Sequence, residues 1–197
     1  MKAFRSMLAV FVICLAAMAQ SPRKTPAPPA SQSAPDSQLY RNPTFAFRYR
    51  IPYGWVDRTK EMQQGNDASK GEVLLAIFER PPQAAGDTIN AAVVIGAEKA
   101  AAGLKKPEDY LATLTETATA QGFKPEGDPS ELEMDSQRML RADFSRSLND
   151  KLTMHQSTLV LLGRGQIVTF TFLAESAEAL DNLIDGLSFS PAKSKAK

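Results

Sequence analysis

The sequence predicts an α+β fold built mainly on an antiparallel β-sheet, and two patterns carry this prediction. Runs of alternating apolar and polar residues are separated by short turn signals, which is typical of antiparallel strands. Helical patterns follow strand patterns at two points, without the regular strand–helix alternation of a parallel sheet. The 197 residues are 43% hydrophobic and 23% charged, which is ordinary for a globular domain.

Residues 1–19 have the pattern of a secretory signal peptide. Lys2 and Arg5 precede an apolar run that ends in Ala17-Met18-Ala19, and small residues at these positions suit a signal peptidase. The run of about 13 residues is too short to span a hydrocarbon core, which needs roughly 20. We therefore expect an exported chain, periplasmic or extracellular, that keeps no integral membrane segment after cleavage.

Cys14 raises an alternative, in which the chain is a lipoprotein. A lipidation signal needs a small residue directly before the cysteine, and this position is Ile13, with Phe11 two residues earlier. If Cys14 leaves with the signal, the mature chain has no cysteine and no disulfide or thiolate chemistry. Cleavage also removes two of the 23 basic residues and leaves a formal charge of −1. Such a balance does not indicate nucleic acid or an anionic membrane as a partner.

Composition divides the remaining chain into three parts. Residues 20–39 are rich in Pro, Ala and Ser with almost no large apolar residue, so we expect a disordered, extended linker. Residues 40–191 form one α+β domain, which is large enough to bury a core without disulfides. Residues 192–197 form a short basic tail.

The domain opens with an alternating strand that ends in a turn. One side of this strand is apolar, and its residues are Phe45, Phe47, Tyr49 and Ile51. Arg48 and Arg50 point to the other side. Pro52 cannot donate to a strand ladder and Gly54 tolerates unusual dihedral angles, so the strand ends there. Trp55 follows the turn and is expected in the core, with ligand stacking as the alternative.

The middle of the chain contains two apolar strands and a helix. Residues 72–79 and 89–98 are apolar runs suited to strands buried on both faces. Pro107 then suits the first position of a helix that ends near Gly122. The helical apolar stripe consists of Tyr110, Leu111, Leu114 and Ala118.

The pattern in the last third of the sequence predicts a strand meander followed by a helix. Alternating runs around residues 140–145, 152–162 and 166–173 are separated by turns at Asn149-Asp150 and Gly163–Gly165. Ser176 suits the N-cap of a final helix. The apolar stripe of that helix is Leu180, Leu183, Ile184 and Leu187. A last extended piece, LSFS, follows Gly186.

This arrangement resembles the PsbP-like family, which includes Mog-like and DcrB-like proteins. The resemblance covers roughly residues 40–190, and its motif is carried by Phe45, Phe47, Ile51, Pro52, Gly54 and Trp55. It implies an α/β/α sandwich, that is, a mainly antiparallel sheet flanked by helices on both faces. It also implies a protein that binds partners or helps to assemble complexes, and it carries over no shared catalytic residue.

The sequence assigns no catalytic, cofactor-binding or metal-ligating residue, and no cofactor is expected. His155 is the only histidine, and a Ser-His-Asp grouping around it lacks the G-x-S-x-G turn of many hydrolases. Glu131, Glu133 and Asp135 share one face of a possible strand, where they favour a charged, protected edge over a calcium site. Lys105 and Lys106 precede a helix and are interpreted as surface residues rather than an anion site.

Three classes of function remain after this search. The favoured hypothesis is an exported, non-enzymatic cell-envelope protein that binds an unidentified envelope protein, as a binding or complex-assembly module. One alternative is a carrier of a small apolar ligand in a cavity lined by residues such as Phe45, Trp55 and Phe170. Another is a hydrolase that uses His155. The position of His155 relative to a pocket and a nucleophile distinguishes these hypotheses.

Overall fold

The structure is a computed structural model that describes residues 38–65, 71–81 and 88–189. The expected signal peptide (1–19) and basic tail (192–197) lie outside the described residues, as do all but the last two residues of the expected linker (20–39). Leu39 already belongs to the first strand, so regular structure begins at the end of that expected linker.

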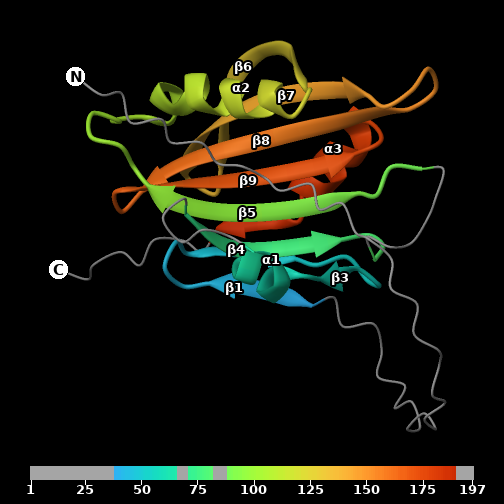
Figure 1. Ribbon diagram of the computed structural model, residues 1–197. Coiled ribbons are helices and arrows are strands. Elements are labelled where there is room, and N and C mark those ends of the chain that lie inside the picture. Colours follow the sequence, from blue (N-terminus) through green and yellow to red (C-terminus); the bar gives the residue numbers. More distant parts are fainter. Residues whose placement is uncertain (1–37, 66–70, 82–87, 190–197) are drawn as a thin grey trace, which may run out of the picture.

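The described residues form two antiparallel sheets (Figure 1). The larger sheet has the strand order β3-β4-β5-β9-β8-β7-β6. Its strands are β3 (Val56–Asp57), β4 (Glu72–Phe78), β5 (Ala92–Lys99), β6 (Lys124–Met134), β7 (Gln137–Ser147), β8 (Thr153–Gly163) and β9 (Gln166–Ala174). The smaller sheet has the order β1-β2-β10, with the strands β1 (Leu39–Asn42), β2 (Phe47–Arg50) and β10 (Leu187–Phe189).

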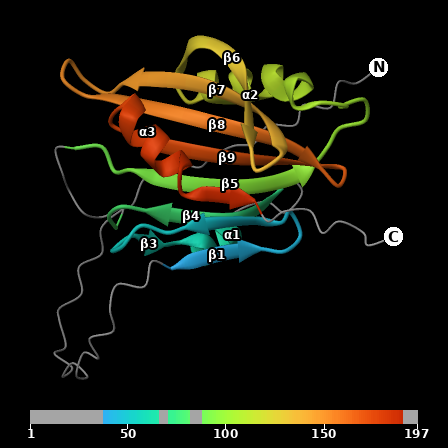
Figure 2. The same cartoon turned by 180° about the vertical axis from the view of Figure 1, so that it is seen from behind.

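Helices cover both faces of the larger sheet, which confirms the predicted fold class. A 3₁₀ turn, η2 (Pro107–Tyr110), leads into α2 (Leu111–Ala120) on one face. On the opposite face lie α3 (Ala177–Ile184) and the smaller sheet (Figure 2). None of the helices within the described residues is long and apolar enough to cross a membrane.

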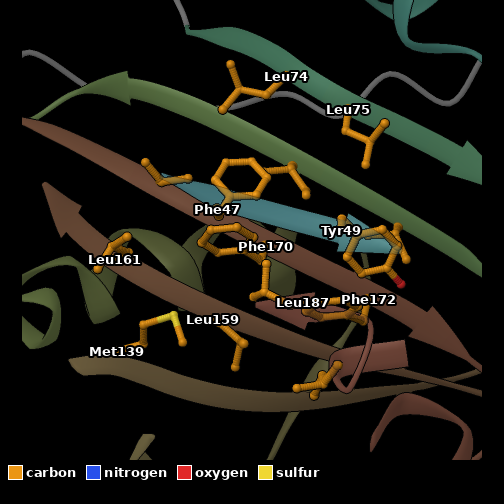
Figure 3. Packing of buried hydrophobic residues seen from close by; sticks show 14 of the residues in the cluster. Phe47, Tyr49, Leu74, Leu75, Met139, Leu159, Leu161, Phe170, Phe172 and Leu187 are labelled. Carbon is orange, nitrogen blue, oxygen red and sulfur yellow. The ribbon is translucent and has the colours of Figure 1, made fainter. Parts of the chain in front are cut away.

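The main hydrophobic core lies between the larger sheet, the smaller sheet and α3. Phe47 of β2 packs edge-on against Phe170 of β9 with ring centroids 5.1 Å apart, and Phe189 of β10 lies 6.0 Å from Phe170. Tyr49 lies 6.3 Å from Phe172 (Figure 3). These aromatic contacts join β2 and β10, which are distant in sequence, to the central strand β9.

A second apolar cluster lies under α2, and it confirms the predicted helical stripe. Tyr110, Leu114 and Ala118 are buried against the sheet. They meet the even-numbered apolar residues of β7, which are Leu140, Ala142 and Phe144. Since residues two apart share one face of a strand, Met139 on the other face of β7 belongs to the main core instead.

Both edges of the larger sheet are protected. The short strand β3 pairs with only the end of β4, and α1 (Thr59–Gly65) continues along the same edge. There the Ala76 amide donates to Thr59 Oγ1 at 2.9 Å, and Gln63 Nε2 donates to the Val73 carbonyl at 2.8 Å. At the other edge, β6 is exposed, acidic and interrupted by a register shift between Glu126 and Ser130.

The opening strand is shorter than predicted, but its apolar side is buried as predicted. Phe47, Tyr49 and Ile51 are buried, as expected. The strand begins at Phe47 rather than Phe45, because the Phe45 amide donates to Asn42 Oδ1 at 3.0 Å and Ala46 has a φ of 58°. These features form a tight turn that joins β1 to β2.

Two other predictions need correction in detail. The run 89–98 was expected to be buried on both faces, yet strand β5 starts at Ala92, and Val94 and Gly96 are only half-buried. Trp55 was expected in the core, but it is half-buried and packs against the edge of the main cluster. The described elements cover Val94 and Gly96 on β5 only in part, and the same holds for Trp55.

Candidate functional site

His155 lies on β8, on the sheet face that carries α3. Its Nδ1 atom is 3.2 Å from Glu126 Oε2, on the bulged edge strand β6. Ser157 is two residues further along β8 and therefore faces the same side. Ser157 is fully buried, and its Oγ has no hydrogen-bond partner among the described residues.

This arrangement does not assemble the groups that a serine hydrolase needs. A nucleophilic serine must contact both its base and the substrate, and Ser157 is 0% exposed. His155 Nδ1 contacts Glu126, as the acid of a triad would, but no hydrogen bond joins His155 Nε2 to a serine among the described residues. The described residues thus show no contact between His155 and a solvent-accessible serine.

A charged network beside His155 has a structural role. Arg141 Nε donates to both carboxylate oxygens of Asp143 at 3.0 Å, and Arg141 Nη1 donates to Asp181 Oδ1 at 2.8 Å. Burial lowers the pKa of Arg141, but the hydrogen bonds to Asp143 and Asp181 outweigh it and raise that pKa above its ordinary value. Asp181 lies on α3, so the network fastens α3 to β7.

A small, mostly apolar cavity lies between α2 and the sheet. Its volume is about 50 Å³, which is enough for a few water molecules and well below the roughly 300–1,000 Å³ of ordinary ligand pockets. Its walls include Tyr110, Thr117, Gln121, Gln156, Thr158, Thr169 and Thr171. Gln156 Nε2 donates to Thr158 Oγ1 at 3.1 Å, so two of the polar side chains in this wall are already hydrogen-bonded to each other.

The residues named for an apolar carrier do not line this cavity. Phe170 is fully buried among Phe47 and Phe189 in the main core. Phe45 and Trp55 are half-buried at the edge of that same core. These three aromatic side chains therefore contribute to packing, and the carrier hypothesis gains no support from their positions.

The acidic run and the lysine pair lie at the surface. Glu131 and Glu133 are exposed on β6, where Glu131 accepts a hydrogen bond from Arg138 Nε at 3.0 Å. Asp135 lies in the following turn and accepts from the Phe189 amide at 2.9 Å. Within the described ranges, no group of three or more His, Cys, Asp or Glu side chains is placed to hold a metal ion.

The backbone around Lys105 and Lys106 is already satisfied by an internal carboxylate. The Lys105 and Lys106 amides donate to Asp109 Oδ2 at 2.9 and 3.2 Å. The hydrogen bond from Lys105 is the main reason why the pKa of Asp109 lies below its ordinary value. Asp109 therefore occupies the position that an external anion would take.

The outer face of the smaller sheet carries a cluster of arginines, which we call the arginine face. It consists of Arg41 on β1 together with Arg48 and Arg50 on β2. Arg41 and Arg48 are directly opposite each other in the strand register. None of the three arginines forms an ion pair with a carboxylate of the described chain.

Tyr53 is an exposed aromatic residue just after the end of β2. It lies in the Pro52–Gly54 turn and is 84% exposed, far more than the other exposed large apolar side chains, Leu39 and Leu148. Sequence reasoning had placed Arg48 and Arg50 on the polar side but missed Tyr53 and the pairing of Arg41 with Arg48. Recognising the turn between Asn42 and Phe47 would have predicted that register.

No family model and no curated protein matches the sequence. Among solved structures, cyanobacterial PsbP from Synechocystis is similar with a TM-score of 0.54 at 12% identity, over 83% of this chain and 98% of that chain. LpqN of Mycobacterium tuberculosis, described as involved in cell envelope biogenesis, gives a TM-score of 0.45 at 16% identity, over 78% and 90% of the two chains. The Ran-binding protein Mog1p of Saccharomyces cerevisiae gives 0.46 at 6% identity, over 77% and 84%.

The similarity to cyanobacterial PsbP confirms the predicted resemblance as one of fold. The chain has a PsbP-like architecture, with an antiparallel sheet between helices, along almost the whole length of that protein. At 12% identity the likeness transfers the fold and no residue role. Any function must therefore be argued from the surface of this chain.

Proposed function

We propose that the chain is an exported, non-enzymatic protein of the cell envelope, periplasmic or extracellular, that binds another envelope protein as a binding or complex-assembly module. The observation that supports it most is the arginine face with the neighbouring, exposed Tyr53. Arginine and tyrosine are enriched among the residues that dominate binding energy at protein interfaces.

The domain arrangement supports the same proposal. A cleaved signal peptide at residues 1–19 would export the chain, and a proline-rich linker over residues 20–39 would let the domain of residues 40–191 reach a neighbour. The basic tail at residues 192–197 would follow the domain. The proposal includes no cofactor and no catalytic residue, and it assigns no role to nucleic acid.

Site-specific photo-crosslinking in the native envelope tests this proposal. A photoreactive phenylalanine analogue replaces one exposed residue at a time: Tyr53, Lys105, Glu133 or Lys151. We expect a discrete crosslinked envelope protein from at least one of these surfaces. Folded variants that form no protein crosslink at any of the four positions would contradict the proposal.

Export is tested separately, by N-terminal sequencing of the chain recovered from the envelope. We expect the mature chain to begin at Gln20, because Ala17 and Ala19 satisfy the signal peptidase. A chain that starts at a lipid-modified Cys14 would instead establish the lipoprotein alternative.

A further inference from the structure

The arginine face combines like charges with an unsatisfied donor. Arg41 and Arg48 are cross-strand partners, an arrangement in which like charges are destabilising. The Arg48 Nε atom is buried and has no hydrogen-bond partner among the described residues. A buried donor without an acceptor is costly to folding, and an anionic ligand on this face would relieve the repulsion between Arg41 and Arg48.

The composition of the smaller sheet makes this face uniformly positive. The residues of β1, β2 and β10 include three arginines and no acidic residue. The inner face of the sheet, with Phe47, Tyr49 and Phe189, is buried in the core, so the arginines cannot turn inward. By contrast, Arg58, Arg138 and Arg141, which lie outside the smaller sheet, each have a carboxylate partner.

We propose that the arginine face docks an extended acidic segment of the partner protein, an inference that rests on the proposed function. Arg48 and Arg50 are two residues apart on β2, which places them about 6.6 Å apart along the strand. Alternate residues of an extended peptide have the same spacing, so successive outward carboxylates of such a segment meet successive guanidinium groups. Each guanidinium can bind a carboxylate with two parallel hydrogen bonds.

Two other anionic occupants fit the observations less well. An anionic membrane would attract the whole chain weakly, because the chain left after the expected signal cleavage would have a formal charge of −1. A second copy of this chain could offer its acidic β6, but Glu131 there is already paired with Arg138. A contact between two different surfaces of identical chains also tends to continue into open filaments.

The test measures binding of the full chain, purified from the envelope, to a synthetic peptide of six Glu-Thr repeats. The matched peptide has six Gln-Thr repeats, and vesicles of one part phosphatidylglycerol to two parts phosphatidylcholine represent a membrane. The test variant combines Arg41→Gln, Arg48→Gln and Arg50→Gln. The control variant removes three exposed charges elsewhere, by Lys99→Gln, Lys151→Gln and Arg164→Gln.

We expect the acidic peptide to bind and the Gln-Thr peptide not to bind. The arginine variant should weaken binding by about tenfold or more, and the control variant by less than about twofold. Equal weakening by both variants would overturn the proposal. So would binding to the vesicles without binding to the peptide, or self-association of the wild-type chain that the arginine variant abolishes.

The crosslinking scan separates this inference from the proposed function. A crosslink at Tyr53 that the arginine variant abolishes supports both. Protein crosslinks confined to the positions of Lys105, Glu133 or Lys151 leave the protein-binding function intact and overturn the arginine face as its docking surface.

Discussion

Tyr49 of β2 links the smaller sheet to the end of α3. Its hydroxyl donates to the Leu183 carbonyl at the end of α3, at 3.0 Å. A Cβ atom placed on Gly186 would lie 3.1 Å from two atoms of the Tyr49 ring, so glycine at this position allows the chain to pass close to the ring. The sequence indicated a break at Gly186 but not the distant side chain that requires it.

Burial of two tyrosines predicts a loss of stability at alkaline pH. Burial raises the pKa of Tyr49, and burial together with a hydrogen bond to Glu98 raises that of Tyr110. Above about pH 10 the unfolded tyrosines ionise while the folded ones keep their protons, so the free energy of unfolding falls as pH rises. The slope approaches about 1.4 kcal/mol per pH unit for each tyrosine.

Urea titrations between neutral pH and about pH 11 measure this slope. Tyr49→Phe should make the decline above pH 10 about half as steep, since Tyr110 still contributes. Tyr53→Phe is the matched control, because Tyr53 is 84% exposed. An unchanged slope in Tyr49→Phe would contradict the assignment.

Two aromatic residues of the same core should differ in their contribution to stability. Phe170→Ala should lower the free energy of unfolding by about 3–5 kcal/mol, because its fully buried ring contacts Phe47 and Phe189. Trp55→Ala should cost less, about 1–3 kcal/mol, because Trp55 is only half-buried. Chemical denaturation measures both values. A larger loss for Trp55 would restore the sequence-based expectation that Trp55 is a core residue.

At the scale of elements, local signals predicted the helices and the meander well, except that Leu187, expected in the last helix, belongs to β10. Ser176 caps α3 as expected, and the turn at Gly163–Gly165 joins β8 to β9, with positive φ angles at Arg164 and Gly165. Alternation along β7 correctly separated its two faces. These features depend on residues that are close together in the sequence, so the sequence alone is enough to predict them.

The smaller sheet could not be predicted in this way. Tyr49 of β2 is the register partner of Leu187 of β10, a contact between the two ends of the domain. A three-residue strand after α3 has too little periodicity to indicate a partner. The arginine face depends on this sheet, so its assembly was also missed, although Arg48 and Arg50 were placed on the correct side.

The N-cap of α3 provides a test at this scale. Ser176 Oγ accepts from the Ala179 amide at 3.1 Å. Ser176→Ala should lower the free energy of unfolding by about 1 kcal/mol, because it leaves that amide without a side-chain acceptor. Ser130→Ala, at an exposed position of β6, should change it by less than about 0.5 kcal/mol. Equal effects in urea denaturation would contradict the capping role.

At the scale of the whole molecule, the two faces of the larger sheet are used differently. One face carries α2 over a small cavity, and the other carries α3 and the smaller sheet over the aromatic core. His155 lies on the sheet face that carries α3, with Glu126 as its partner, on the opposite side from that cavity. The arginine face carries three arginines that form no ion pair within the described residues, and this is where the proposed function places its partner.

Complementation of a host strain that lacks the chain tests the central claim most directly. We predict that His155→Ala restores function, because the partly exposed His155–Glu126 pair contributes at most about 1 kcal/mol to stability. The combined Arg41→Gln, Arg48→Gln and Arg50→Gln variant should fail to restore function while remaining folded, and the Lys99, Lys151 and Arg164 control should succeed. Failure of a folded His155→Ala variant, together with success of the arginine variant, would contradict a binding function through this face and favour a hydrolase.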